Sequence, residues 1–269
     1  MLELKGGAVK EFENGTTPAE IAKSIGAGLY KSVCCAKVDG DLCDLRTPLE
    51  KDCKVELLTF DNVDGQKTFW HTASHVLAQA VKRLYPNAKC AIGPAVDNGF
   101  YYDFDVEKPF SPEDLEKIKA EMKKIVKSGL ELERVELSPE EAEKKLEEMN
   151  EPYKVELVKE HSDKGEHITF YKQGEFIDLC AGPHLMSVAP IKAIELTACT
   201  GAYWRGDANN AQLCRVYGVA FPKASMLEEH LKKLEEAKLR DHNKLGRELE
   251  YFTTVDYVGQ GLPILLPKG

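Results

Sequence analysis

Three short segments of this chain carry the pattern of a helix start, and they limit how the residues between them can fold. Thr17-Pro18-Ala19-Glu20 supplies an N-cap residue, a proline at the first helical position and the acidic residue of a capping box. Ser111-Pro112 and Ser138-Pro139 are each followed by acidic residues, which favour the first turn of a helix. Strand-like runs separate these starts, so we expect an α+β fold.

Composition narrows the class of protein. The chain has 269 residues, more than a typical domain of about 100–200, so we expect two domains. It is 43% hydrophobic and 30% charged, which is ordinary for a soluble globular protein. It has no apolar run long enough for a signal peptide or a membrane span, so a cytoplasmic location without membrane partners is the default. A net charge of −9 argues against nucleic-acid binding through bulk positive charge.

The cysteines give no sign of a disulfide framework. The eight residues form no CxxC pair, and the chain has no export signal. We therefore expect free thiols at positions 34, 35, 43, 53, 90, 180, 199 and 214.

Residues 1–60 predict a compact, β-rich module. The helix that begins at Thr17 should extend to about Gly26. Segments 33–38 and 41–45 alternate and flank Asp39-Gly40, a dipeptide suited to a tight hairpin. The run CKVELLTF, which ends at Phe60, should form the last strand.

Residues 61–222 predict a second, α+β domain. A helix is expected over 69–84 and a turn at Asn98-Gly99. Strands are expected near 154–159, 167–173, 176–180, 191–197 and 213–221. Residues 223–245 read as one long connecting helix. Residues 246–269 are too short to fold alone, and their apolar end suggests the beginning of a larger domain cut at Gly269.

Two histidine-containing motifs predict a shared polar site. His71 and His75 in HTASH are four residues apart, so both rings leave one face of the expected helix. The segment DLCAGPHL places Asp178, Cys180 and His184 around a Gly-Pro turn. Two imidazoles, a thiol and a third imidazole match a zinc site, and a set of four would saturate a structural zinc. The same groups could instead hydrolyse a bond without metal, and both interpretations stay open.

Two aromatic motifs have a functional and a structural interpretation. Tyr101 and Tyr102 in IGPAVDNGFYYDF could line a pocket for a base, or fill the core of a hairpin. Tyr203, Trp204 and Arg205 in GAYWRGD could stack on a base or contact phosphate, with core packing as the alternative.

These motifs occur in the order HTASH, IGPAVDNGFYYDF, DLCAGPHL, GAYWRGD and RDHNKLGRELE. In that order they resemble the N-terminal part of bacterial threonyl-tRNA synthetases over essentially the whole chain. The resemblance implies a small β-grasp-like TGS domain over 1–60, an editing domain over 61–222, a linker helix over 223–245 and a truncated start of the catalytic domain over 246–269. The first and third motifs are also similar to alanyl-type editing modules, but the TGS-like start favours the threonyl family.

The resemblance implies a proofreading activity. A site shaped for threonine admits serine, and one missing methyl group costs only about 1–3 kcal/mol of discrimination. An editing domain would therefore hydrolyse serine from threonine tRNA, whose serine-carrying acceptor end is the implied partner. Two alternatives remain, namely a non-catalytic tRNA-docking module with structural zinc and an alanyl-type trans-editing deacylase.

The family's editing signature transfers to named positions of this chain. Its catalytic set matches His71, His75, Lys154, Asp178, Cys180 and His184. We expect His71 and Lys154 to handle protons, and the other four to position water and substrate. Zinc would bind His71, His75, Cys180 and His184. The pocket should be lined by Ala91, Ile92, Gly93, Pro94 and Tyr102.

The resemblance also assigns some functions to other parts of the family's enzymes. The sites for ATP, Mg and the zinc of the catalytic core lie in domains beyond the matching region. We therefore expect no ligase activity from this chain. The family's enzymes are homodimers through that core, so this chain is expected to be monomeric.

Overall fold

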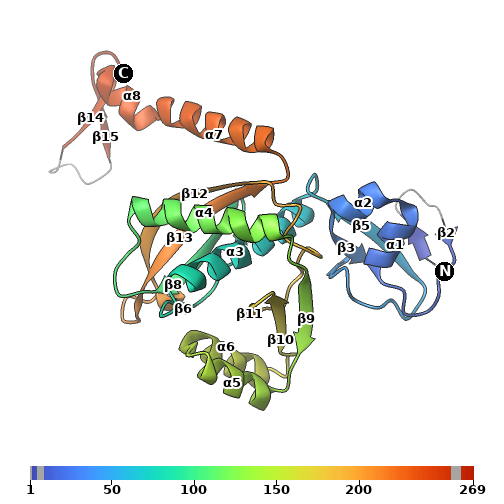
Figure 1. The fold of residues 1–269 in the computed structure, drawn as a ribbon. Coiled ribbons are helices and arrows are strands. Elements are labelled where there is room, and N and C mark those ends of the chain that lie inside the picture. Colours follow the sequence, from blue (N-terminus) through green and yellow to red (C-terminus); the bar gives the residue numbers. More distant parts are fainter. Residues whose placement is uncertain (1, 5–8, 256–261) are drawn as a thin grey trace. The chain divides into compact units, whose positions relative to one another are not determined.

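The computed structural model describes residues 2–4, 9–255 and 262–269 (Figure 1). The chain forms two compact units, Met1–Lys223 and Ala224–Gly269. Helices and sheets occur together in the first unit, as expected for an α+β protein.

The first sheet belongs to the opening module and has the strand order β2-β1-β5-β3-β4, with β1 and β5 parallel. Thr17 caps helix α1 in a complete capping box with Glu20, as the sequence predicts. Asp39 and Gly40 both have positive φ at the predicted hairpin. The module's elements are β1 (Leu2–Leu4), β2 (Val9–Lys10), α1 (Pro18–Ile25), α2 (Ala27–Ser32), β3 (Val33–Val38), β4 (Asp41–Cys43) and β5 (Cys53–Thr59).

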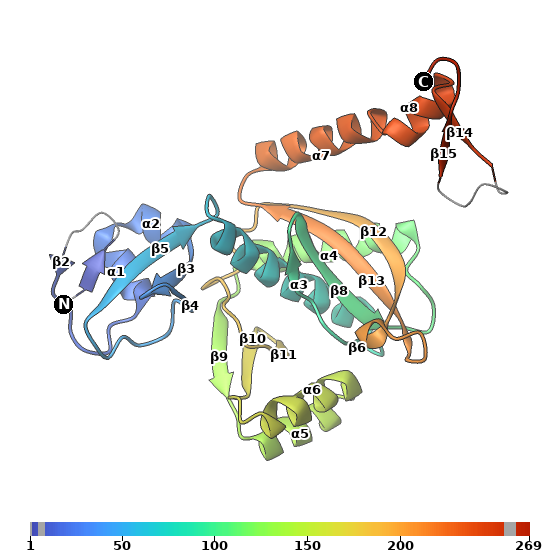
Figure 2. The same cartoon turned by 180° about the vertical axis from the view of Figure 1, so that it is seen from behind.

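The second sheet has the order β12-β13-β8-β6, with β7 added to β8, and helices α3 and α4 pack together against it (Figure 2). The indole N–H of Trp70 in α3 donates to the carbonyl of Ala220 in β13 at 2.9 Å, which ties helix to sheet. The elements are α3 (Val63–Leu84), β6 (Lys89–Cys90), β7 (Ala95–Val96), β8 (Gly99–Asp105), α4 (Pro112–Ser128), β12 (Ala193–Tyr203) and β13 (Gln212–Phe221).

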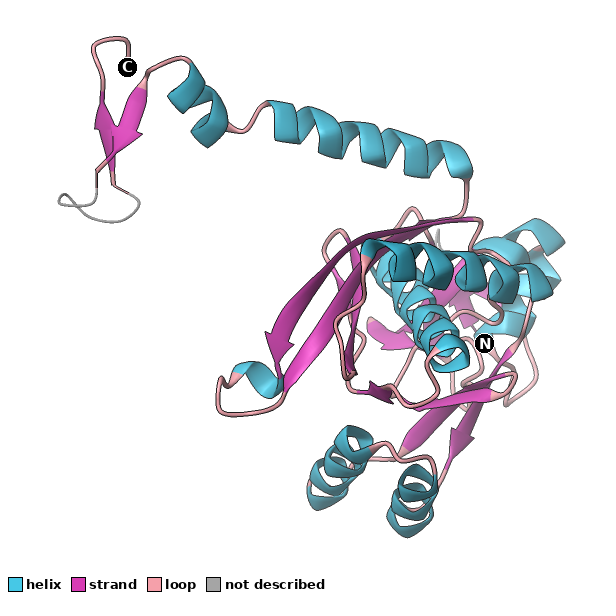
Figure 3. Cartoon of the chain, turned by 60° about the vertical axis from the view of Figure 1, so that its left-hand side comes forward, coloured by secondary structure: helices cyan, strands magenta, loops and turns pink. Residues whose placement is uncertain are grey.

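A third sheet, of order β11-β10-β9, is covered by the helix pair α5 and α6 (Figure 3). Ala142, Leu146 and Val158 of the helices bury their side chains against Ile168 and Phe170. The elements are β9 (Leu132–Glu136), α5 (Pro139–Glu148), α6 (Pro152–Asp163), β10 (Thr169–Gln173) and β11 (Phe176–Leu179).

The predicted strand over 154–159 is wrong, because these residues lie inside helix α6. Pro152 occupies the first turn of the helix, where its missing N–H costs nothing. The buried residues are Lys154 and Val158, four apart, which is a helical spacing. Strand β9 was not predicted, because four of its five residues are exposed or half-buried and three are charged.

The second unit contains α7 (Ala224–Leu239), α8 (His242–Glu248) and a hairpin of β14 (Phe252–Thr254) with β15 (Pro263–Leu265). The single linker helix expected over 223–245 is therefore two helices with a break after Leu239. Residues 256–261 of the expected catalytic-domain start lie outside the described residues. Within the described part of the chain, no helix is both long and apolar enough to cross a membrane.

Gly65 provides a test of how closely the start of α3 packs against the end of β5. A Cβ atom at this position would lie 1.9 Å from the carbonyl oxygen of Thr59, at the end of β5. Gly65→Ala should therefore lower the free energy of unfolding by about 2 kcal/mol, measured by urea denaturation. Gly28→Ala is the matched control, since nothing lies within 4 Å of its Cβ position in α2. Equal stabilities of the two variants would contradict the proposed packing.

Candidate functional site

A cleft of about 370 Å³ brings the two histidine-containing motifs together. His71 and His75 reach it from α3, Lys154 from α6, and Cys180 from the segment that follows β11. The cleft also receives Ile92, Gly93, Pro94, His161, Glu166, His167, Thr169, Asp178 and Gly182. Segments more than 100 residues apart in the sequence thus converge on one site.

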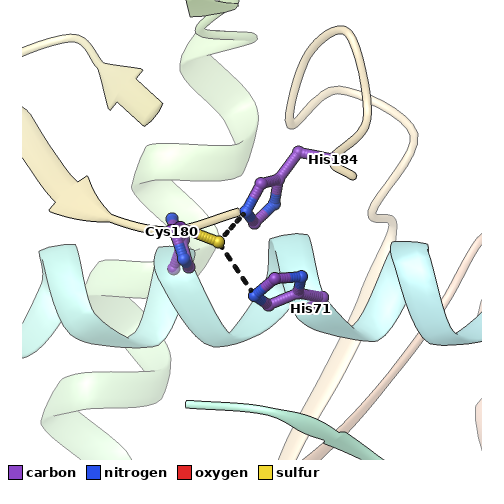
Figure 4. A group of neighbouring side chains, drawn as sticks. His71, Cys180 and His184 are labelled. Carbon is purple, nitrogen blue, oxygen red and sulfur yellow. Dashed lines mark hydrogen bonds between the residues drawn. The ribbon is translucent and has the colours of Figure 1, made fainter. Parts of the chain in front are cut away.

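Cys180 lies between two imidazoles (Figure 4). Its sulfur is 3.3 Å from Nε2 of His71 and 3.2 Å from Nε2 of His184. The His75 ring is 4.2 Å from the His184 ring, measured between centroids. One turn of α3 and one Gly-Pro turn therefore place three imidazoles around a thiol.

His71 and His184 are held in the neutral form. Burial lowers the pKa of His71 to about 4, and burial together with the neighbouring His71 and His75 lowers the pKa of His184 well below its ordinary value. The Thr72 hydroxyl donates to the carbonyl of Thr68, so its oxygen accepts from Nδ1–H of His184 at 3.2 Å. Nε2 of His184 is then left with a free lone pair, directed at the Cys180 thiol.

This arrangement fits a zinc ion. One ligand atom from each of His71, His75, Cys180 and His184 lies within 4.8 Å of all the others. The two sulfur–nitrogen distances, 3.3 and 3.2 Å, are slightly shorter than the separation of about 3.5 Å between sulfur and nitrogen ligands of a tetrahedral zinc, so a small outward shift of the side chains would admit the ion. Nδ1 of His75 is buried without a hydrogen-bond partner among the described residues. The four groups can hold zinc, and doing so would use every position of a tetrahedral ion.

Asp178 forms a buried charge network beside the cluster. Its carboxylate accepts from the Tyr102 hydroxyl at 2.6 Å, pairs with the Lys154 ammonium at 2.8 Å, and lies 3.6 Å from Nε2 of His75. Burial alone would raise the pKa of Asp178, but Lys154 and His75 outweigh it and the pKa is lowered. Burial would likewise lower the pKa of Lys154, but Asp178 holds it above its ordinary value. Both groups are charged at neutral pH.

Lys154 is aimed at Asp178 by contacts at the start of α6. Glu151, the residue before the helix, is buried and accepts from the backbone N–H of Cys90 at 2.6 Å. Its other oxygen pairs with the ammonium of Lys82 in α3 at 2.8 Å. Helix α6 is thereby fixed to both α3 and β6, and Lys154 follows three residues later on the inner face.

The opening module contributes residues that the sequence analysis did not single out. The buried carboxylate of Asp44 accepts from the Tyr171 hydroxyl at 2.8 Å and from the backbone N–H of His184 at 3.2 Å. Arg46 donates to the carbonyls of Leu132 at 3.0 Å and Leu185 at 2.8 Å. We call Asp44 and Arg46 the clasp. It holds the segment that carries His184, and no local pattern in the sequence marks these loop residues.

The structure separates the predicted pocket residues into two groups. Ile92, Gly93 and Pro94 line the cleft, whereas Ala91 packs with Trp204 and Leu213 in a small core. Tyr102 is fully buried and supports Asp178 from behind the cleft. A Cβ atom at Gly93 would lie 2.1 Å from the Tyr102 ring, so a glycine is needed where the two segments cross.

The other aromatic candidates lie outside the cleft. Tyr101 stacks under the guanidinium of Arg215, 3.9 Å from the ring centre, and Trp204 is buried. Arg205 forms ion pairs with Glu156 and Glu160 of α6.

Two family models match parts of the chain. Residues 3–59 match the TGS domain family, and residues 168–217 match the family described as the threonyl and alanyl tRNA synthetase second additional domain. The second match contains Asp178, Cys180 and His184.

Curated relatives match over the whole chain. A threonine–tRNA ligase of Clostridium perfringens is 57% identical over 268 residues, which are 100% of this chain and 41% of that protein. Those of Acetivibrio thermocellus and Caldanaerobacter subterraneus are 56% and 54% identical, again over 100% of this chain and 42% of each relative. The chain belongs to the threonine–tRNA ligase family. It corresponds to the N-terminal region and spans about two fifths of the length of these ligases.

The clasp of this ligase region can be tested by a double-mutant cycle. Asp44→Ala and Tyr171→Phe each remove the charge-assisted hydrogen bond between the two side chains. We expect a coupling energy of about 2 kcal/mol in urea unfolding, because the bond is buried and one partner is charged. Additive effects of the two substitutions would show that the contact does not stabilise the protein.

Proposed function

We propose that this region hydrolyses the ester bond that joins serine to the 3′-terminal adenosine of threonine tRNA. The observation that carries the proposal is the open cleft in which the neutral imidazole of His71, a thiol and a charged lysine converge. Ester hydrolysis needs a group that accepts a proton from water, a proton donor for the leaving oxygen, and positive charge near the developing oxyanion. The cleft offers all three.

His71 is the group best suited to accept the proton of the attacking water. Its lowered pKa keeps the imidazole neutral at neutral pH, so one ring nitrogen has a free lone pair, and the residue is partly exposed to the cleft. The partner of Nε2 is the Cys180 thiol at 3.3 Å, which substrate and water can replace. In this scheme Cys180 and His184 position the water, and the thiol is not itself a nucleophile.

Lys154 supplies the positive charge. Its raised pKa keeps the ammonium protonated, so it stabilises the oxyanion and donates toward the leaving oxygen but does not act as a base. Asp178 holds it in place, with His75 and Tyr102 completing the carboxylate's contacts. Ile92, Gly93 and Pro94 form the wall nearest the substrate.

Deacylation assays test this assignment directly. The 269-residue chain should release serine from threonine tRNA and leave threonine in place, measured with labelled amino acids. His71→Ala should slow serine release by about 10²–10⁴-fold, the usual contribution of a proton-transfer group. Val63→Ala is the control on the same helix, because Val63 is exposed and lies outside the cleft.

Two outcomes would count against the proposal. One is serine release that is unchanged in His71→Ala. The other is absence of release by a chain that demonstrably binds the charged tRNA. Binding without hydrolysis would favour the second candidate, a tRNA-docking module with structural zinc, which the tight four-residue ligand set supports.

The effect of removing or adding zinc on serine release distinguishes the two candidate functions, the hydrolase and the tRNA-docking module with structural zinc. We expect serine release to persist in the presence of EDTA and to fall when zinc is added, since a zinc ion on all four ligands has no open position for water and occupies His71. Loss of both activity and folded structure on chelation would instead establish the structural-zinc alternative. Zinc content by mass spectrometry provides the independent readout.

The relatives are named for the ligation of threonine to tRNA. We infer that a full-length ligase containing this region carries out that ATP-dependent reaction in its other domains. On this inference the region is a soluble, cytoplasmic proofreading module whose partner is the acceptor end of threonine tRNA.

A further inference from the structure

Two cysteines outside the cleft lie in sulfur contact. Cys199 in β12 and Cys214 in β13 have their Sγ atoms 2.7 Å apart, although both are free thiols. In the antiparallel register Cys199 is opposite Val216 and Cys214 is opposite Gly201. The two cysteines are therefore diagonal neighbours on one face of the sheet, and the residue directly opposite Cys214 has no side chain to separate the sulfurs.

The two thiols differ in exposure and acidity. Cys199 is partly exposed, whereas Cys214 is buried. The hydrogen bond from Cys214 lowers the pKa of Cys199 to about 7, and a backbone hydrogen bond from Phe110 acts in the same direction. The same contact, together with burial, raises the pKa of Cys214. An accessible thiolate thus sits against a buried, protonated thiol, which is the arrangement of an attacking and a resolving cysteine.

We propose that Cys199 and Cys214 form a redox site that takes low-molecular-weight peroxides and closes reversibly to a disulfide. The Cys199 thiolate attacks one oxygen of hydrogen peroxide, the O–O bond breaks, and with one proton the products are a sulfenic acid and water. The Cys214 sulfur then attacks the sulfenic sulfur and displaces a second water. In total two thiols lose two hydrogens and one peroxide becomes two waters.

The position of the pair in the sheet explains why the disulfide should be easy to reduce. Bond formation requires the sulfurs to approach by a further 0.7 Å or so, to about 2.05 Å. Diagonal positions on neighbouring strands lie about 7–8 Å apart, somewhat beyond the Cα separation of up to about 6.8 Å in ordinary disulfides, so the two strands must move slightly closer. A bridge formed there is strained and therefore more reducible than a structural disulfide.

The other cysteines are poorer candidates for a bridge. Cys34 and Cys35 are buried and adjacent in sequence, and burial raises the pKa of Cys35 to about 11. Cys90 is buried and its pKa is raised well above the ordinary value. Cys180 is partly exposed, but its sulfur is in contact with histidines. Cys180 is therefore substituted in the test below, so that its own reaction with peroxide does not obscure that of the Cys199–Cys214 pair.

Peptide mapping tests the proposal in the 269-residue chain carrying Cys180→Ser. Brief treatment with hydrogen peroxide, followed by alkylation of the remaining thiols, should give a protein that has lost two hydrogens. Trypsin cuts after Lys192, Arg205 and Arg215, so the bridge should join peptides 193–205 and 206–215. Dithiothreitol should separate them.

Single substitutions distinguish the roles of the two cysteines. Cys214→Ser should abolish the linked peptides and leave a sulfenic acid at Cys199 that dimedone traps. Cys199→Ser should slow peroxide consumption by about tenfold or more, because the remaining thiol is buried and protonated. A treated protein without the 193–205 to 206–215 link, or a Cys199→Ser variant that reacts at the original rate, would overturn the proposal.

Discussion

The carboxylate of Asp178 must be paired because it is buried, and its partners come from several elements. Tyr102 reaches it from β8, Lys154 from α6 and His75 from α3. An unpaired charge in this position would carry a large desolvation penalty, so these elements can pack only in an arrangement that brings all three partners together. The cleft is a consequence of that arrangement. His71 and Cys180 line the space that remains next to the network, and the buried His184 contacts Cys180.

The opening module also contains a buried carboxylate whose pairing fixes how neighbouring segments pack, namely that of Asp44 in the clasp. Asp44 is buried in a loop of that module, and its carboxylate is satisfied by Tyr171 and by the backbone of His184. A Cβ atom at Gly182 would lie 2.2 Å from the Tyr171 hydroxyl, so a glycine with positive φ is required there. Packing of the module thus supports the segment that carries two of the four cluster residues. The module is a structural part of the site although none of its described residues lines the cleft.

Where a short sequence pattern marks a helix start, a turn or a helix face, the sequence predicted the local structure correctly. The capping boxes predicted the starts of α1, α4 and α5, and Asp39-Gly40 predicted the first hairpin. The spacing of His71 and His75 predicted two rings on one helix face. Residues whose roles depend on distant partners were not found in this way. Lys154 was assigned through the family resemblance while its segment was taken for a strand, because α6 has a weakly amphipathic sequence and is held in place by Glu151 and Lys82.

The sequence by itself determined the α+β class, the family, and which residues could carry chemistry, since helix caps, turns and motif order are local properties of the chain. Only the tertiary structure decided that Tyr102 supports Asp178 from behind the cleft, that the clasp holds His184, and that Cys199 meets Cys214. Each of these depends on burial and on the register between segments far apart in sequence. Such contacts arise when the whole unit packs, and short-range patterns do not encode them.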